Sequence, residues 1–108
     1  MKNKGRKILE YQALIFKALG QPTRLEILHL LKDGERCVCE IFPEINQEQA
    51  NVSKHLSLLK QAGILDSRKE GLRIIYWIKR REILNLLDTV SALLRVQARE
   101  HHELMTGA

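Results

Sequence analysis

Residues 47–63 read QEQANVSKHLSLLKQAG and have the periodicity of an amphipathic helix that ends at Gly63. Val52, Leu56 and Leu59 recur on one face at helical spacing. The opposite face holds small, amide and hydroxyl side chains and one lysine: Gln49, Ala50, Ser53, Lys54, Ser57 and Gln61. Side chains of this kind can approach base edges in the DNA major groove and hydrogen-bond to them. The segment therefore predicts a DNA-reading helix, and an amphipathic surface helix without a ligand is the alternative.

The positive charge of the chain is concentrated on this helix and on the segment that follows it. Residues 47–81 contain eight Lys or Arg and three Asp or Glu, so they account for the whole formal net charge of +5. A polyanionic partner explains such a local excess better than general solubility does. A membrane surface is a poor candidate because no predicted helix combines a basic face with exposed Trp and Phe anchors. Nucleic acid is therefore the expected partner, and no membrane association is expected.

Length and composition indicate one soluble globular domain that spans residues 1–108. Hydrophobic residues make up 44% of the chain and charged residues 29%, which is typical of globular proteins. No apolar run approaches the roughly 20 residues of a membrane span, and no signal peptide opens the sequence, so we expect a cytoplasmic protein. The two cysteines, Cys37 and Cys39, are too close together to cross-link distant parts of a secreted fold.

The segments on either side of the reading helix predict a mostly α fold with a β-hairpin. Helices are predicted over 8–19, 22–31, 37–42, 47–63 with Asn46 as N-cap, and 82–105, and strands over 64–69 and 73–78. Four helices, a hairpin and a last helix in this order make an α+β winged helix-turn-helix, in which the hairpin is the wing. The last helix is more apolar than a small domain can bury, which predicts a homodimer formed through residues 7–19 and 82–105.

No catalytic arrangement is recognisable in the sequence, so we do not expect an enzyme. The chain has no CxxC on a βαβ pattern, no P-loop, no HExxH and no Ser/His/Asp arrangement. A small thiol-dependent reductase is the enzymatic alternative. A winged-helix module used only for protein contacts is a further alternative, which the localised positive charge disfavours.

Four sequence motifs follow one another along the chain. They are ALGQPTRLEIL at 18–28, ERCVCEI at 35–41, QANVSKHLSLL at 49–59 and AGIL at 62–65. Together they resemble the ArsR/SmtB family of metal-responsive repressors, and the second motif resembles the cysteine box of its arsenic and cadmium branches. The resemblance implies a winged-helix homodimer that binds an imperfect palindrome in duplex DNA, needs no cofactor to do so, and dissociates when an inducer binds.

By position, the resemblance matches residues of the reading helix to the base- and phosphate-facing residues of the family. Gln49 would pair with an adenine edge, Ser53 would contact a base or a phosphate, and Lys54 would neutralise a phosphate. Cations at the hairpin tip would reach an adjacent minor groove or the backbone, unless they only guard a solvated edge strand. For His55, at the edge of the apolar face, half-buried packing and DNA contact are both open. The predicted DNA-contacting residues are Gln49, Ala50, Asn51, Ser53, Lys54, Ser57, Arg68, Lys69 and Arg73.

Cys37 and Cys39 are the only thiols of the chain, and the resemblance implies that they bind As(III) or another soft metal(loid) as inducer. Both lie at the start of a predicted helix, where thiolates are stabilised by the helix N-terminus and by Arg36. Side chains at i and i+2 of a regular helix point about 200° apart, so one ion would join both sulfurs only if the first turn deforms. A deformation at this point would tilt the reading helix and favour a state that cannot bind DNA.

The arsenic-type box of the family usually has a third cysteine three residues after the second, and this chain has Phe42 there. The N-terminal cysteine of the cadmium variant is also missing. Three kinds of chemistry remain open: a two-thiolate ligand such as Hg(II) or a methylated or aryl arsenical; a third ligand from water, a thiol or Glu40; and reversible oxidation of the pair. The last would make the chain a repressor that responds to thiol redox state or reactive sulfur. Small buried packing residues are the remaining interpretation of the two cysteines.

Overall fold

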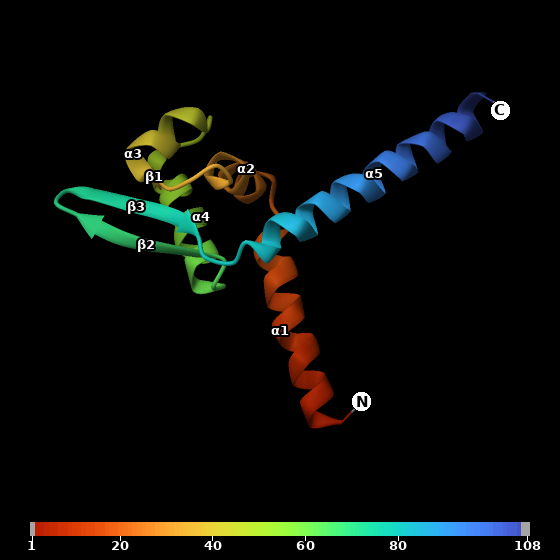
Figure 1. Ribbon diagram of the computed structural model, residues 1–108, viewed down its shortest axis with the longest axis horizontal. Helices are drawn as coiled ribbons and strands as arrows, with labels where there is room; N and C mark the ends of the chain where they lie inside the picture. The colour runs from red at the N-terminus through yellow and green to blue at the C-terminus, as the bar shows by residue number, and fades with distance from the viewer. Residues whose placement is uncertain (1, 107–108) are drawn as a thin grey trace.

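The computed structural model describes residues 2–106 and has a winged body from which two helical arms extend (Figure 1). Its elements are α1 (Asn3–Leu19), α2 (Pro22–Leu31), β1 (Arg36–Cys37), α3 (Val38–Ile41), the 3-10 helix η1 (Phe42–Glu44), α4 (Gln49–Gln61), β2 (Leu65–Glu70), β3 (Arg73–Ile78) and α5 (Glu82–Thr106). The hairpin of β2 and β3 projects from one side of the body, and α1 and α5 leave it elsewhere (Figure 1). This arrangement confirms the predicted α+β winged helix-turn-helix. Positions 1, 107 and 108 of the predicted domain lie outside the described residues.

A short strand that the sequence did not predict joins the hairpin. β1 pairs antiparallel with β3, so the sheet has the order β1-β3-β2. Its residues Arg36 and Cys37 lie opposite Tyr76 and Ile75. A strand this short shows no hydrophobic period in the sequence, and it forms because the edge of β3 offers partners to its backbone. Consequently the predicted third helix starts one residue later, at Val38.

The reading helix also begins later than predicted. α4 starts at Gln49 with Glu48 in the N-cap position, so the expectation that Asn46 caps the helix is wrong. The Gln47 side-chain amide donates to the Thr23 hydroxyl of α2. This tertiary contact fixes the residues before α4 and overrides the local capping preference of an asparagine.

Two glycines with left-handed backbone conformations end α4 and turn the hairpin. Gly63, the predicted end of the reading helix, has φ +78, and the next amide, that of Ile64, donates to the Leu59 carbonyl at 3.0 Å. Gly71 has φ +61 at the turn between β2 and β3. A side chain would be strained in either conformation. Gly63 therefore sets the point at which the chain leaves α4 for the wing.

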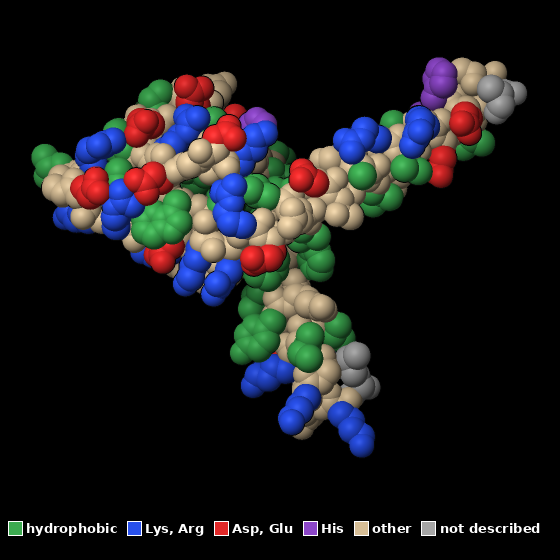
Figure 2. All heavy atoms as spheres, viewed as in Figure 1, with side chains coloured by type: hydrophobic (Ala, Val, Ile, Leu, Met, Phe, Trp, Pro, Cys, Tyr) green, Lys and Arg blue, Asp and Glu red, His purple; other side chains and the backbone are tan. Residues whose placement is uncertain are grey.

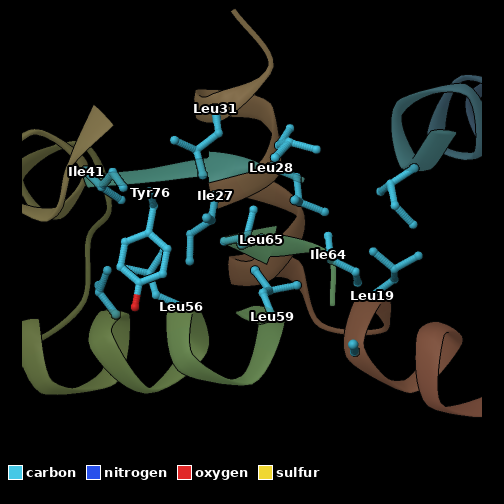
Figure 3. Packing of buried hydrophobic residues seen from close by; sticks show 14 of the residues in the cluster. Leu19, Ile27, Leu28, Leu31, Ile41, Leu56, Leu59, Ile64, Leu65 and Tyr76 are labelled. Carbon is cyan, nitrogen blue, oxygen red and sulfur yellow. The ribbon is translucent and has the colours of Figure 1, made fainter. Parts of the chain in front are cut away.

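The core lies between α2, α4 and one face of the sheet, and side chains from these elements point toward one another (Figure 3). Val52, Leu56 and Leu59 are completely buried, which confirms the predicted apolar face of the reading helix. Each such side chain stabilises the fold by about 1.5–3 kcal/mol relative to an exposed one. α4 is thereby held with its opposite face turned to solvent.

α1 and α5 expose apolar side chains along much of their length (Figure 2). The exposed large apolar residues are Ile8, Leu9, Tyr11, Leu14 and Phe16 on α1, and Val90, Leu93, Leu94, Val96, Leu104 and Met105 on α5. Apolar surface of this extent indicates an interaction face, and it coincides with the segments predicted to form a dimer. Within residues 2–106, no helix has the length and apolar character that a membrane crossing requires.

Leu56→Ala should lower the free energy of unfolding by about 2–5 kcal/mol, because it leaves a cavity in the core. Leu72→Ala is the matched control: Leu72 is 100% exposed at the hairpin turn, and its truncation should cost less than about 0.5 kcal/mol. Urea unfolding followed by circular dichroism measures both variants. Equal losses of stability would contradict the packing described for α4.

Candidate nucleic-acid interface and cysteine pair

α4 presents the predicted base-reading residues on the side away from the core. Each of the residues predicted to contact DNA is exposed, both on α4 and at the hairpin. Gln49, Ser53 and Ser57 follow one another at intervals of four residues and form a stripe, the reading stripe, that borders the hairpin. Ala50 and Lys54 lie beside this stripe on the next helical row. These five residues therefore share one face that a DNA groove could approach.

The wing cation Arg68 is held by carboxylates of the same chain. It donates to both carboxylate oxygens of Glu35, with N–O distances of 2.6 and 2.7 Å, and to Glu70 at 2.8 Å. It also lies 5.5 Å from the centre of the Trp77 ring, within cation–π range. The hydrogen bond from Arg68 lowers the pKa of the Glu35 carboxyl, and the same contact raises the pKa of Arg68. The sequence did not predict these partners. To bind a DNA phosphate through the same nitrogens, Arg68 would have to release Glu35 or Glu70.

Cys37 and Cys39 lie side by side and are joined as a disulfide. Cys37 is the N-cap of α3, with extended backbone angles (φ −66, ψ 147), and its Cα lies 5.0 Å from that of Cys39. The expected divergence of the two side chains by about 200° is therefore wrong, because Cys37 stands outside the helix and no helical turn separates the sulfurs. Cys37 is 2% exposed, whereas Cys39 is exposed. Reagents in solution thus reach the pair through Cys39.

Glu40 connects the cysteine pair to the tip of the wing. The Cys39 amide donates to the Cys37 sulfur at 3.0 Å, and the Cys37 amide donates to Glu40 Oε1 at 3.1 Å, which together make a capping box. The same Oε1 accepts from the Arg73 guanidinium at 3.2 Å. The spacing Cys-x-x-Glu is the sequence signal that could have identified this cap. Glu40, one of the third ligands considered for the sulfurs, is thus already engaged.

Three separate contacts tie the cysteine segment to the hairpin. Cys37 lies opposite Ile75 in the β1–β3 ladder. On either side of this ladder, the carboxylates of Glu35 and Glu40 bind arginines of β2 and β3. Within residues 2–106, no group of three or more His, Cys, Asp or Glu side chains is arranged to hold a metal ion. The site is therefore a sulfur pair mechanically linked to the wing.

Arg24 fastens the outer flank of α4 to the first two helices. Its Nε donates to His55 Nδ1 at 3.1 Å, and its terminal nitrogen donates to the carbonyls of Ala18 at 3.2 Å and Lys17 at 3.4 Å. His55 is half-buried in this contact, which agrees with the packing interpretation. Asn51 lies one turn before His55 on the same flank, so it is not gathered with the reading stripe.

His55 should make the stability of the protein pH-dependent. Its pKa is lowered by burial first, and then by the charges of Arg24 and Lys54. Because the folded-state pKa lies below the unfolded value of about 6.5, this stabilisation is present above about pH 6.5 and is lost as the pH falls through the folded-state pKa. Between about pH 7.5 and 5, the Tm of the wild type should therefore fall more than that of His55→Gln.

Circular dichroism melts across this pH range measure the effect. His29→Gln, which replaces an exposed histidine of α2, is the matched control and should keep the wild-type pH dependence. Parallel pH profiles for His55→Gln and the wild type would contradict the role assigned to the Arg24–His55 hydrogen bond.

Known proteins share both the sequence and the fold of this chain. Residues 21–67 match the family model described as bacterial regulatory protein, arsR family. The HTH-type transcriptional regulator MJ1325 of Methanocaldococcus jannaschii is 48% identical over 83 residues, covering 73% of this chain and 93% of that protein. The homodimeric winged helix-turn-helix DNA-binding domain of Mb0332 from Mycobacterium bovis superposes with a TM-score of 0.75 and 34% identity, covering 95% of this chain and 92% of that one.

The relatives include regulators named for resistance to cadmium and to arsenicals. The cadmium resistance transcriptional regulatory protein CadC of Listeria innocua is 43% identical over 74 residues, covering 68% of this chain and 62% of CadC. The arsenical resistance operon repressor of Escherichia coli is 43% identical over 63 residues, covering 57% of this chain and 54% of the repressor. The chain thus spans less than two thirds of either protein.

Proposed function

The chain belongs to the ArsR family of transcriptional regulators, and we propose that it is a repressor that leaves its operator when a trivalent arsenical or another soft metal ion binds Cys37 and Cys39. The paired cysteines carry this proposal, because Cys37 is linked to the wing through the β1–β3 ladder and through Glu40, and both cysteines lie beside the exposed face of α4. The cadmium resistance regulator and the arsenical resistance repressor among the relatives support a soft ligand. No cofactor is needed for DNA binding in this proposal.

DNA binding would use α4 in the major groove and the hairpin against the backbone. Gln49 and Ser53 would contact base edges, with Ala50 allowing close approach. Lys54 and Lys69, which form no ion pair within residues 2–106, would neutralise phosphates. Phosphate contacts fix the position of the protein, whereas base contacts determine the sequence it selects.

Two copies of the chain would pair through the exposed apolar faces of α1 and α5. The homodimeric domain from Mycobacterium bovis supports this arrangement. A two-fold dimer offers two copies of α4 to major-groove segments roughly 34 Å apart. Its operator would therefore be an imperfect palindrome in duplex DNA.

A soft ion at the sulfurs would act through the cap of α3. Bonding to an ion would take the Cys37 sulfur away from the Cys39 amide and would displace Cys37 from its position opposite Ile75. The displacement would reach Arg73 through Glu40 and change the position of the wing relative to α4. A coupling free energy of about 1–3 kcal/mol is usual between two such sites, which corresponds to roughly a 5–150-fold loss of DNA affinity.

A thiol-redox switch on the same scaffold is the second candidate, favoured by the disulfide that joins Cys37 and Cys39. Two-electron oxidation of the dithiol by a peroxide, or reaction with a reactive sulfur species, would then release DNA. A thiol reductant would restore binding. The two candidates share the DNA-binding surface and differ in the reagent that acts on the sulfurs.

Arsenicals should release the reduced protein from a fluorescent duplex taken from its own upstream region, as measured by anisotropy at fixed salt. Cys37→Ser should bind this duplex with wild-type affinity, because serine is also a good N-cap. It should not respond to arsenite or phenylarsine oxide, because one sulfur remains. Release of Cys37→Ser from the duplex at the arsenical concentrations that release the wild type would contradict the proposal. Release by peroxide or persulfide alone, reversed by a reductant, would favour the redox candidate.

Substitutions on α4 should separate base reading from phosphate binding. Gln49→Ala should weaken operator binding by about 1–3 kcal/mol and relax the preference at one base pair. Lys54→Ala should weaken binding to all sequences and reduce the salt dependence by about one phosphate contact. His29→Ala, which removes an exposed polar side chain of α2 outside the predicted dimer segments, is the control and should bind as the wild type does. An unchanged ratio of operator to non-specific affinity in Gln49→Ala would rule out the assigned reading role.

A further inference from the structure

A groove of about 350 Å³ opens between α3, α4 and the hairpin, and both cysteines line it. Its apolar lining residues include Ile74 of β3, which is exposed, and Tyr76 of β3 and Leu56 of α4, which reach it from the core. An apolar cavity of roughly 150 Å³ is enough to hold benzene. The space beside the cysteine pair therefore accommodates one aromatic ring.

The reading stripe of α4 forms another wall of the same groove. Gln49, Ser53 and Ser57 line it, and Arg73 of the wing lies with them. A molecule in the groove would be in contact with side chains that are proposed to face DNA. Occupation of the groove and reading of base edges would therefore exclude each other sterically, in addition to any displacement of Cys37.

We propose that this groove binds the ring of an aryl-substituted trivalent arsenical whose arsenic is held by Cys37 and Cys39. This inference rests on the proposed binding of arsenicals at the pair and identifies the class of arsenical. Trivalent arsenic forms three bonds, of which the two sulfurs supply two. Within residues 2–106, no additional His, Cys, Asp or Glu completes a cluster of three with them. An aryl carbon fills the third position, and the ring then lies against Ile74 and Tyr76.

Binding exchanges oxygen for sulfur at arsenic and leaves the oxidation state of arsenic unchanged. A thiol reductant first cleaves the Cys37–Cys39 disulfide, which gives two thiols and a disulfide of the reductant. An arylarsonous acid has two hydroxyl groups on arsenic. Two As–O bonds break as two As–S bonds form, each departing hydroxide takes one thiol proton, and two water molecules are released.

The apolar wall distinguishes an aryl arsenical from smaller ones. Burial of a ring against apolar side chains adds affinity in proportion to the area removed from water. The methyl group of a methylarsenical covers little of this wall. Arsenite would place a hydroxyl group against the apolar side chains, where it would lose hydrogen bonds to water that nothing replaces. Phenyl, methyl and inorganic arsenicals should therefore bind in decreasing order of affinity.

The test compares phenylarsine oxide with methylarsonous acid on the reduced protein without DNA. Each complex is titrated with a small dithiol chelator, which takes over the two As–S bonds, and native mass spectrometry of the protein gives the fraction that still carries arsenic and hence a midpoint of release. Ile74→Ala should lower the ratio of the phenyl midpoint to the methyl midpoint about 10-fold, because it removes apolar contact with the ring. Leu25→Ala, which truncates an exposed leucine of α2 outside the groove, is the control and should leave the ratio unchanged.

A second measurement does not depend on any variant. Ring protons of the bound phenyl group should show nuclear Overhauser effects to the methyl groups of Ile74. A midpoint ratio unchanged in Ile74→Ala, or ring contacts confined to other residues, would overturn the groove assignment while both arsenicals still bind. Failure of both arsenicals to bind the wild type would instead overturn the proposed function, and the groove assignment with it.

Discussion

The carboxylate of Glu40 holds the cysteine segment in place, and the geometry of the sulfur pair depends on it. Its Oε1 accepts the backbone N–H of Cys37 and the guanidinium of Arg73. The first bond keeps Cys37 in the N-cap position, where its sulfur meets that of Cys39. The second bond fixes the first residue of β3. One side chain therefore connects the backbone of the sulfur pair with the tip of the wing.

This connection is well suited to a switch because the contacts of Glu40 are weak compared with the packing of the hydrophobic core. The side chains of Glu40 and Arg73 are 54% and 55% exposed, and exposed ion pairs are worth about 0–1 kcal/mol each. By contrast, Leu56 and Leu59 fasten α4 to a completely buried core. A ligand at the sulfurs therefore has to overcome only a few weak contacts to move the cysteine segment. The wing and the cap can rearrange while α2 and α4 stay packed together.

Periodicity made most of the fold predictable from the sequence, because α4 and the hairpin bury one face each. The apolar face of α4, the termination of the helix just before Gly63 and the strand over 73–78 all follow from local patterns. Local patterns predicted neither the true N-cap of α4, which is Glu48 and not Asn46, nor the strand β1. The residues before α4 are fixed by the contact from Gln47 to α2, and β1 exists only as a partner of β3. Both depend on chain segments distant in sequence.

The candidate site likewise has features that follow from the sequence and features that depend on distant parts of the chain. The exposure of the residues of α4 followed from the helix alone, since their faces are set by the buried side chains opposite. The ion pairs of Arg68 with Glu35 and of Arg73 with Glu40 did not follow from it, because each carboxylate lies 33 residues away from its arginine in sequence. The position of Cys37 depended on a single residue at a helix boundary, and such boundaries are the least certain feature of a sequence pattern. The groove beside the sulfurs needed the arrangement of three elements at once.

The most direct test of the coupling between the cysteine pair and the reading face is the affinity of the reduced protein for an arsenical with and without operator DNA. Binding linkage is reciprocal, so an arsenical that weakens DNA binding must itself bind more weakly to the DNA complex by the same factor. We predict that saturating operator weakens arsenical binding by the same factor of roughly 5–150. Equal affinity of the arsenical for the free and DNA-bound protein would show that the two sites are independent, and would contradict this account.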